Sequence, residues 1–330
     1  MSKPRIMLTN PLWPSWQRQL EAEAEVVVAP DGAPETLRQL AATADALIVR
    51  SPLPDDIFDS APRAVACVRN GAGLDRIPVE RATALGIPVA NAPGGNAHSV
   101  AEFCLALMLS LARRLAPIAR ELHATGWHEA RTLLAGNREL TGKTLGILGV
   151  GAIGSRLAQI CHHGLGMRVL GCQRRLDRLP PFVAPATLTQ VFSESDFVVV
   201  ACPLTEATRG LVSRELIARM KTTAFLVNVA RGPVVDEPAL IEALAQRRIA
   251  GAGLDVFWKQ PLPRDHPFLT LDNVLLTPHV AGTTDDSRER ISAVVVEELR
   301  RMLRGEKPVN FVNPECWPRV QARRAALGHR

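Results

Sequence analysis

Three segments in the second half of the chain carry residues that could do chemistry on a small carboxylic acid: VNVARGPVVDE (227–237), GAGLDVFWKQP (251–261) and TPHVAG (277–282). Each lies at or just after a predicted strand end, where open parallel sheets bind their ligands. Reduction of a 2-oxoacid requires a cation for the carboxylate and carbonyl oxygens and an acid for the developing alkoxide. Arg231 can supply the cation and His279 the proton. Taken alone, Arg231 could form a structural ion pair, and His279 could be a helix-capping or satisfied core histidine. The occurrence of both at predicted strand ends favours a catalytic role for each.

A glycine-rich turn precedes these segments, in TLGILGVGAIGSRLA (144–158). Gly149, Gly151 and Gly154 directly follow an apolar run and open a helical one. This arrangement allows a tight turn, close approach of backbone N–H groups to a pyrophosphate, and close helix packing. We therefore expect a dinucleotide here, in contact also with the intervening residues Ala152 and Ile153. A glycine-rich turn that binds nothing is the plainer alternative.

The residues after the next predicted strand bear on the choice of cofactor. Many dinucleotide enzymes keep an acidic residue there for the ribose hydroxyls, but this chain reads Gln173, Arg174, Arg175. A neutral amide and two guanidinium groups remove the repulsion of a 2′-phosphate and supply bidentate donors. The sequence therefore predicts NADP(H) as the preferred cofactor and NAD(H) as the alternative. Without a ligand, the two arginines would be solvated loop charges.

Short β-rich runs alternate with helical stretches along the chain, which predicts an α/β fold with parallel, helix-covered sheets. The strands are expected at 6–9, 25–28, 46–49 and 65–69, and then at 144–148, 168–172, 197–201, 224–228, 251–254 and 274–277. We predict two Rossmann-like or flavodoxin-like domains. Residues 1–98 plus 283–330 would form a discontinuous substrate domain, and 99–282 the dinucleotide-binding domain.

Two long helices are expected to bracket the second series of strands. The stretch 99–123 is helical in pattern and apolar over much of its circumference, with Ser99 as its expected N-cap and a kink expected at Pro117. The second helix is expected over 285–304. It should end at Gly305, where a C-cap is favoured.

Composition excludes several classes of protein. With 330 residues, 47% of them hydrophobic, the chain can bury a sizeable core, and its length indicates one large domain or two medium ones. Tyrosine is absent, which excludes the Tyr/Lys chemistry of short-chain dehydrogenases. The six cysteines show no spacing typical of a zinc site, so we expect no metal. No signal-like start and no membrane-spanning segment is evident, so we expect a cytoplasmic protein without a membrane partner.

The formal charge of +6 comes partly from arginines near the C-terminus and partly from dispersed ones. Because aromatic residues are not interleaved with them, we interpret the terminal arginines as a solvated basic tail and expect no nucleic-acid partner. These arginines are Arg319, Arg323, Arg324 and Arg330.

Over nearly its full length the chain resembles the D-2-hydroxyacid dehydrogenase family. Beside the segments above, the resemblance rests on RNGAGLDRIP (69–78), NAHSVAE (96–102) and CPLTEATRGLV (202–212). It implies a homodimer of two-domain subunits with the active site in the interdomain cleft. It also implies small-molecule substrates, of which the glyoxylate and hydroxypyruvate class is favoured, and D-2-hydroxyacid products. By this resemblance Arg231 would polarise the substrate and His279 would donate the proton.

The resemblance also assigns binding residues by matching positions. The backbone of Ala72 and Gly73 would hold the substrate carboxylate, with help from Arg50. The residues that would line the cofactor are Pro203, Thr208, Ala230 and Asp255, with Asp255 near the nicotinamide.

One position departs from the family pattern. The family usually places a glutamate five residues after the aspartate of GLDVF, where it pairs with the catalytic histidine and raises its pKa, but this chain has Gln260. An amide can orient an imidazole by hydrogen bonding, but it cannot stabilise imidazolium by charge. We expect activity to survive, because an unperturbed histidine is about one quarter protonated at pH 7.

The glutamine also supports a second interpretation, because the chain resembles formate dehydrogenases of the same superfamily around WKQPLPRDHP (258–267). Formate oxidation releases a hydride without a proton relay, so a neutral partner would suit it, and Asn96 could contact formate. A third interpretation is a dinucleotide-sensing scaffold, since the chain also resembles the C-terminal-binding-protein corepressors. Retention of Arg231 and His279 weighs against a scaffold.

Overall fold

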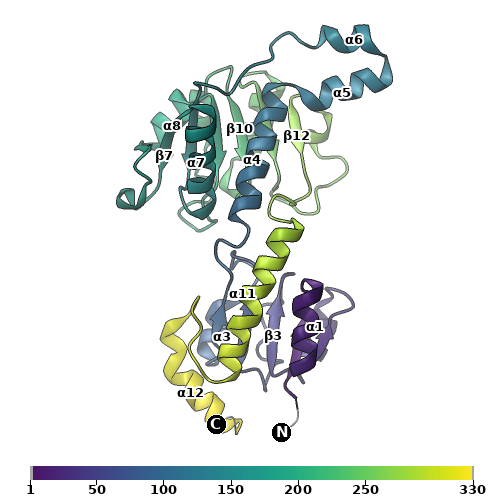
Figure 1. The fold of residues 1–330 in the computed structure, drawn as a ribbon, viewed down its shortest axis with the longest axis vertical. Coiled ribbons are helices and arrows are strands. Elements are labelled where there is room, and N and C mark those ends of the chain that lie inside the picture. The colour runs from purple at the N-terminus through teal and green to yellow at the C-terminus, as the bar shows by residue number, and fades with distance from the viewer. Residues whose placement is uncertain (1–2, 329–330) are drawn as a thin grey trace. The chain divides into compact units, whose positions relative to one another are not determined.

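The computed structural model describes residues 3–328, which divide into two compact units, 3–96 with 283–328 and 97–282. Each unit is a parallel sheet with helices on both faces (Figure 1), so the predicted α/β fold with two parallel-sheet domains is confirmed. None of the helices between residues 3 and 328 is long and apolar enough to cross a membrane.

The second unit has seven parallel strands in the order β12-β11-β10-β9-β6-β7-β8. The order reverses between β6 and β9, and open parallel sheets bind ligands at the carboxyl ends of the strands at such a reversal. The strands are β6 (Thr144–Leu148), β7 (Arg168–Cys172), β8 (Val183–Pro185), β9 (Phe197–Val200), β10 (Phe225–Asn228), β11 (Gly251–Leu254) and β12 (Val274–Leu276). The helices are α4 (Ala97–Ala112), α5 (Leu115–Ala124), α6 (Trp127–Thr132), α7 (Ala152–Leu165), α8 (Leu188–Glu194), α9 (Arg214–Arg219) and α10 (Glu237–Ala245), with 3-10 turns η1 (Leu176–Arg178), η2 (Gly232–Val234) and η3 (Pro267–Thr270).

Two cores lie on the two faces of this sheet. Helices α4 and α7 cover one face, and α8, α9 and α10 cover the other. Because both faces are buried, the strands are nearly continuous apolar runs, such as FVVV in β9.

The prediction of one helix over 99–123 is wrong, since two helices, α4 and α5, cover this stretch. The chain breaks at Arg114, which adopts the left-handed conformation at φ 50°. Pro117 causes no kink because it lies in the first turn of α5, where the missing N–H has no intrahelical acceptor. Ser99 is buried inside α4 and is not its N-cap. The helix predicted over 285–304 is present as α11 (Asp285–Leu303), with Gly305 after it at φ 81°.

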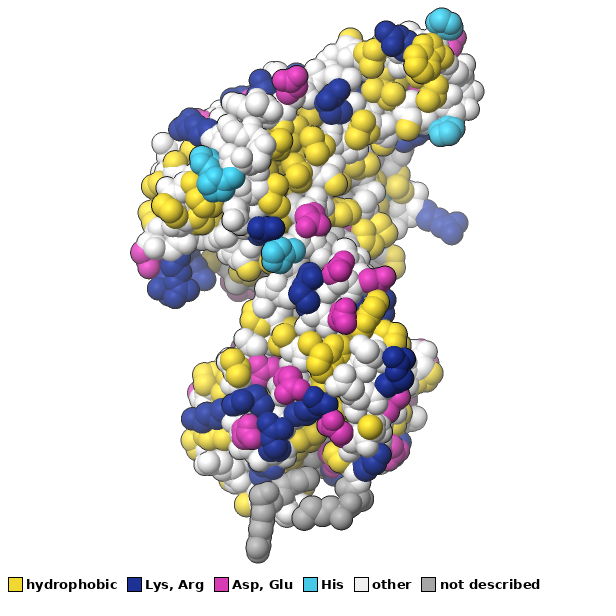
Figure 2. Space-filling model, viewed as in Figure 1, with side chains coloured by type: hydrophobic (Ala, Val, Ile, Leu, Met, Phe, Trp, Pro, Cys, Tyr) yellow, Lys and Arg dark blue, Asp and Glu magenta, His cyan; other side chains and the backbone are white. Residues whose placement is uncertain are grey.

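Helices α5 and α6, here called the arm, extend away from the seven-stranded sheet (Figure 1). None of the described residues of α5 is buried, and Leu115 and Trp127 are 54% and 64% exposed. Hydrophobic side chains gather on the arm, at the upper right of Figure 2. An apolar surface of this kind on a short helical segment typically marks a protein contact.

The first unit has five parallel strands in the order β2-β1-β3-β4-β5. The strands are β1 (Arg5–Leu8), β2 (Glu25–Val28), β3 (Ala46–Val49), β4 (Ala66–Arg69) and β5 (Val89–Ala90). The helices are α1 (Pro14–Glu23), α2 (Pro34–Ala41), α3 (Val79–Ala84), α11 and α12 (Trp317–Ala326), with the 3-10 turn η4 (Pro314–Cys316). Ile6 and Leu8 fill the core shared with α1 and α11, whereas Met7 fills the core on the opposite face.

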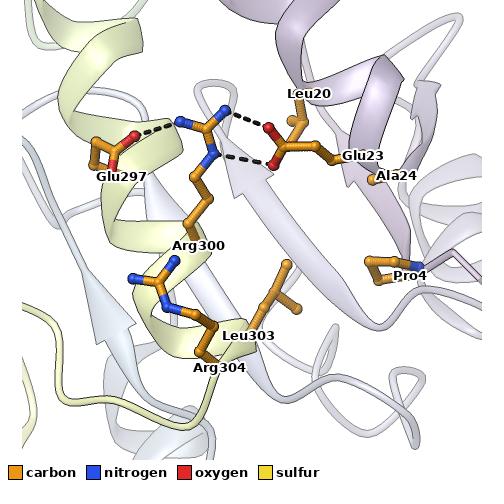
Figure 3. Close-up of a pocket in the computed structure, with 8 residues that line it drawn as sticks. All are labelled: Pro4, Leu20, Glu23, Ala24, Glu297, Arg300, Leu303 and Arg304. Carbon is orange, nitrogen blue, oxygen red and sulfur yellow. Dashed lines mark hydrogen bonds and ion pairs between the residues drawn. The ribbon is translucent and has the colours of Figure 1, made fainter.

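An ion-pair bridge joins α1 to α11 beside a surface groove of the first unit (Figure 3). The Arg300 guanidinium donates to both carboxylate oxygens of Glu23, at 3.0 and 2.6 Å, and it also pairs with Glu297. Arg304 at the same groove pairs with Glu306. Both guanidinium groups already have carboxylate partners, so the cluster links α1 to α11 and is not a candidate ligand site.

The prediction of a solvated basic tail is wrong for Arg323 and Arg324. Arg323 donates to three backbone carbonyls between residues 61 and 64. Arg324 is 8% exposed and donates to the carbonyls of Met302 and Leu303 at the end of α11. The last carbonyls of a helix have no intrahelical partner and carry partial negative charge, which explains the cation. The final arginine of the chain lies outside the described residues.

Candidate active site

Most residues predicted to bind cofactor or to act in catalysis lie in the second unit, shortly after the carboxyl ends of its strands. Gly149 follows β6, Gln173 follows β7, Ala230 follows β10, Asp255 follows β11 and His279 follows β12. Because the strands are parallel, these ends share one edge of the sheet. Residues far apart in the sequence thus come to the edge where such sheets bind ligands.

Three glycines shape the turn between β6 and α7, each for a different reason. Gly149 has φ 94°, and a Cβ there would lie 2.7 Å from Cα of Cys202. Gly154 packs α7 onto the turn, since its Cβ would lie 2.4 Å from the carbonyl oxygen of Gly149. Gly151 faces open space, because apart from Gly151 and its two neighbours in sequence no heavy atom of the described chain lies within 4 Å of a Cβ built there. A side chain at Gly151 would fill room that a bound group could use.

The start of α7 is suited to an anion. The helix begins with Ala152 and Ile153, and within residues 3–328 no side chain caps its first N–H groups. Its 14 residues add a helix dipole that is positive at this end. Uncapped donors beside the open space at Gly151 fit the pyrophosphate of a dinucleotide, which the segment 149–154 would hold.

The loop after β9 packs against this turn. Burial raises the pKa of the Cys202 thiol to about 11, so it stays protonated at neutral pH. The Thr208 hydroxyl donates to the carbonyl of Pro203 at 2.7 Å and accepts from the N–H of Thr205 at 2.7 Å. Pro203 and Thr208, both predicted to line the cofactor, therefore lie together in one closed loop.

The segment after β7 carries two exposed cations. The Gln173 side chain donates to the carbonyl of Arg175 at 2.7 Å, which turns the amide back along the loop. Arg174 is exposed. Arg175 pairs with Asp177 at 3.6 Å, with both side chains more than half exposed. A salt bridge with both side chains this exposed contributes only about 0–1 kcal/mol to stability. The Arg175 guanidinium can therefore leave Asp177 and bind another anion.

Asn228 sets the turn that carries Arg231, and sequence reasoning missed it. The residue is buried, its Oδ1 accepts the N–H of Ala230 at 3.0 Å, and its Nδ2 donates to the carbonyl of Arg231 at 3.1 Å. The Arg231 guanidinium in turn donates to the carbonyl of Ala230 at 2.7 Å. The available signal was an amide residue at the end of the apolar strand FLVN.

The Asp255 carboxylate holds the segment that carries His279. Asp255 is 1% exposed, and its Oδ1 accepts from the Thr277 hydroxyl at 2.6 Å. Its two oxygens also accept from the N–H groups of Val280 and Ala281, both at 2.9 Å. His279 lies between these anchors at φ 57°, which is uncommon for a residue other than glycine. The anchors on both sides explain how this backbone conformation is maintained.

Gln260 and His279 lie together. Oε1 of Gln260 is 2.9 Å from Nδ1 of His279. An amide oxygen only accepts, so Nδ1 carries a hydrogen and Nε2 is the nitrogen that can exchange a proton. The amide thus orients the ring without adding a charge.

The residues predicted to hold the substrate carboxylate lie in the first unit, where buried Arg69 shapes their loop. Arg69 ends β4, and its Nε donates to the carbonyl of Gly73 at 2.8 Å. Its NH1 donates to the carbonyls of Val49 at 2.7 Å and Arg50 at 3.1 Å. The guanidinium therefore fixes the loop with Ala72 and Gly73 against the end of β3. Sequence reasoning missed Arg69, although a charged residue at the end of an apolar strand was a signal.

Arg50 follows β3 in the same unit. Its guanidinium donates to the Thr283 hydroxyl at 3.4 Å. Burial lowers the pKa of Arg50, and the neighbouring Arg288 and Arg76 lower it further. Crowded cations of this kind favour an anion nearby. Asn96 lies half-buried just before α4, and its contact with a substrate stays a prediction.

A family model identifies the second unit. The model of the NAD-binding domain of D-isomer-specific 2-hydroxyacid dehydrogenases matches residues 105–281. The chain belongs to this family. This D-2-hydroxyacid dehydrogenase is therefore an oxidoreductase that interconverts 2-oxoacids and 2-hydroxyacids with a nicotinamide dinucleotide. The family and the reaction class predicted from the motifs are confirmed.

Relatives match this dehydrogenase over almost its whole length. It is 37% identical over 322 residues to the glyoxylate reductase of Korarchaeum cryptofilum, covering 95% of this chain and 97% of the relative. It is 38% identical over 291 residues to glyoxylate/hydroxypyruvate reductase B of Yersinia pestis, covering 87% and 89%. A solved NADPH-dependent glyoxylate/hydroxypyruvate reductase from Sinorhizobium meliloti, in complex with NADP and malonate, matches with a TM-score of 0.85 at 28% identity, covering 95% and 98%.

We expect Asp255→Asn to lower both stability and turnover of the dehydrogenase. The amide presents an NH2 group to donors that now bind carboxylate oxygens, and an unsatisfied buried donor costs about 1–3 kcal/mol. Urea unfolding would measure the stability loss, and turnover should fall in the folded protein because the His279 segment loosens. Asp272→Asn, at an exposed aspartate paired with Arg247, is the matched control. Equal effects of the two substitutions would contradict this role of Asp255.

Proposed function

We propose that this dehydrogenase reduces a small 2-oxoacid of the glyoxylate and hydroxypyruvate class to the D-2-hydroxyacid. The observation that carries the proposal is the 2.9 Å contact between Gln260 Oε1 and His279 Nδ1, because it leaves proton exchange to Nε2 of a histidine held at a strand end. The names of the relatives, glyoxylate reductase and glyoxylate/hydroxypyruvate reductase, support the substrate class.

In this mechanism Arg231 and His279 divide the work. The guanidinium of Arg231 is permanently charged and holds the substrate carboxylate while polarising the carbonyl. The bound nicotinamide supplies the hydride. The imidazolium of His279 donates its Nε2 proton to the oxygen that becomes the hydroxyl, and Nδ1 keeps its hydrogen in the bond to Gln260. In oxidation, neutral Nε2 accepts the hydroxyl proton.

The preferred cofactor in this proposal is NADP(H), with NAD(H) as the weaker alternative. Gln173 offers no carboxylate to repel a 2′-phosphate, and Arg174 and Arg175 are exposed cations just after β7. Arginine binds phosphate in a bidentate manner. The solved relative from Sinorhizobium meliloti is described as NADPH-dependent, which supports the same preference.

Formate oxidation is a second candidate because the histidine partner is neutral. Gln260 adds no charge to His279, and a reaction that only removes a hydride needs no imidazolium. Initial rates separate the candidates. NADPH and NADH oxidation would be measured with glyoxylate, hydroxypyruvate, pyruvate and phenylpyruvate, and formate would be tested with each oxidised cofactor. Oxoacid-dependent turnover supports the main proposal, and formate oxidation without oxoacid reduction refutes it.

The functional protein in this proposal is a homodimer that pairs through the arm. Leu115, Leu122 and Trp127 are all more than 40% exposed there. A short helix with no buried face is marginally stable alone, and most helical stability in proteins comes from packing of an apolar face. A second copy would cover these side chains.

Removal of both arginines after β7 should change cofactor selectivity. We expect Arg174→Ala with Arg175→Ala to lower kcat/KM for NADPH about a hundredfold or more, because each of the two charge-assisted phosphate contacts contributes about ten- to a hundredfold. The value for NADH should stay within about twofold, because NADH has no 2′-phosphate for these cations to bind. Arg178→Ala, at an exposed arginine in η1, is the control and should alter neither value. A parallel loss with both cofactors would argue against contact with a 2′-phosphate.

A carboxylate at position 260 should move the pH profile. We expect Gln260→Glu to shift the falling limb of oxoacid reduction upward by about one pH unit or more, since a negative charge stabilises imidazolium. The direction follows because reduction uses the protonated form, which then persists to higher pH. Rates would be measured from pH 5 to 9 for both proteins and for Gln321→Glu on α12 as the control for added charge. Superimposable profiles for Gln260→Glu and the parent would remove Gln260 from the mechanism.

Charge on the arm should separate the subunits. We expect the parent to have the mass of a dimer by light scattering during gel filtration, and Trp127→Glu to have the mass of a monomer, because a buried charge in an apolar interface is costly. Val309→Glu, at an exposed apolar residue outside the arm, should remain dimeric. A monomeric parent, or a Trp127→Glu variant that stays dimeric, would refute pairing through the arm.

A further inference from the structure

Gln260 lies in the loop between β11 and η3, residues 255–266, and this part of the loop is at the surface. Residues 258–261 are exposed and belong to no helix or strand, yet Gln260 Oε1 is held 2.9 Å from His279. Surface loops are mobile unless other contacts fix them, and catalytic geometry tolerates deviations of only about half an ångström. The precision of the Gln260–His279 contact therefore requires contacts elsewhere in the loop.

One carboxylate binds both ends of this loop. Oε2 of Glu237 accepts the N–H of Trp258, just before Gln260, at 3.1 Å. Oε1 of Glu237 lies 3.2 Å from Nε2 of His266, near the end of the loop. The Glu237 and His266 side chains are each only 13% exposed, so solvent screens this bridge less than an exposed pair. Glu237 is also the first residue of α10, where the helix dipole favours a carboxylate.

A second hydrogen bond orients His266. Its Nδ1 accepts the N–H of Phe268 at 3.3 Å, so Nδ1 has no hydrogen and Nε2 donates to Glu237. The rings of His266 and Phe268 pack with centroids 4.9 Å apart, and Phe268 is buried. The end of the loop is thus anchored to the core of the unit.

The start of the loop is anchored as well. The indole N–H of Trp258 donates to the carbonyl of Val235 at 2.7 Å. Gly232, in the turn after β10, lies so close that a Cβ there would be 2.0 Å from the carbonyl carbon of Phe257. The base of the Gln260 loop therefore packs directly on the turn that follows the proposed substrate-binding arginine.

We propose that Glu237 and His266 are positioning residues for the catalytic histidine. The hydrogen bond between them, here called the clamp, closes the loop and holds Gln260 Oε1 against His279 Nδ1. The clamp acts through Gln260 rather than on the reacting atoms. This inference rests on the proton-exchange role proposed for His279.

His266→Asn tests the clamp because it separates the two bonds of His266. Asparagine can still accept the N–H of Phe268, as a good capping residue does, but it is too short to reach Glu237. We expect kcat for oxoacid reduction to fall about three- to tenfold, as for loss of one hydrogen bond, with KM for the cofactor unchanged. In a Gln260→Ala background the same substitution should have little further effect. The proposal would be overturned if the two losses of kcat multiply in the Gln260→Ala, His266→Asn double variant, or if the kcat of His266→Asn equals that of the parent.

A second variant, and an NMR measurement that requires no catalytic turnover, complete the test. Glu237→Gln retains only one acceptor oxygen and should lower kcat as His266→Asn does, with unfolding temperatures showing that both variants fold. His163→Asn, at an exposed histidine near the end of α7, is the matched control and should behave as the parent. The NMR signals of the His279 ring, without substrate, should shift in His266→Asn and not in His163→Asn. If the parent reduces no oxoacid, the proposed function fails on its own, and unchanged His279 signals in His266→Asn would overturn the clamp separately.

Discussion

Backbone segments at the carboxyl edge of the seven-stranded sheet approach one another more closely than any side chain permits. Gly149 meets Cys202, Gly154 meets the carbonyl of Gly149, and Gly232 meets Phe257, each at a distance that leaves no room for a Cβ. The first approach joins the loops after β6 and β9, and the last joins the loops after β10 and β11. The N–H of Gly210 donates to the carbonyl of Pro233 at 2.8 Å and links these two pairs into one packed layer. The loops that carry cofactor and catalytic residues depend on that layer for their positions.

Two separate sets of hydrogen bonds hold His279, one acting on its backbone segment and the other on its ring. The Asp255 carboxylate binds the hydroxyl of Thr277 before the histidine and the N–H groups of Val280 and Ala281 after it, while the Gln260 amide fixes the ring. Backbone position and ring orientation are therefore set by different residues. A change of charge at residue 260 can alter the response to pH while the buried carboxylate keeps the histidine in place.

Features that depend on local patterns could be predicted from the sequence. Ten of the twelve strands between residues 3 and 328 follow from apolar runs, and the glycine turn follows from spacing. The short strands β5 and β8 were missed because two or three residues are too few to show a pattern. Features that depend on contacts between distant residues could not be predicted, because a side chain does not reveal its partner. The residues missed for this reason are Arg69, Asn228, Glu237 and His266, which orient loops through hydrogen bonds. The break at Arg114 was missed because Pro117 offered a more familiar signal.

The five-stranded sheet belongs to a unit made of both chain ends, so ribosomal synthesis delivers its parts at different times. Its strands emerge first, but the face with Ile6 and Leu8 is covered by α11, which emerges after residue 282. The enclosed unit, 97–282, is complete by then and can fold before the other. Until α11 arrives, α1 covers only part of that face, and the rest is an exposed apolar surface of the kind that chaperones recognise. One of the last helices to be made thus decides when the first strands become stable.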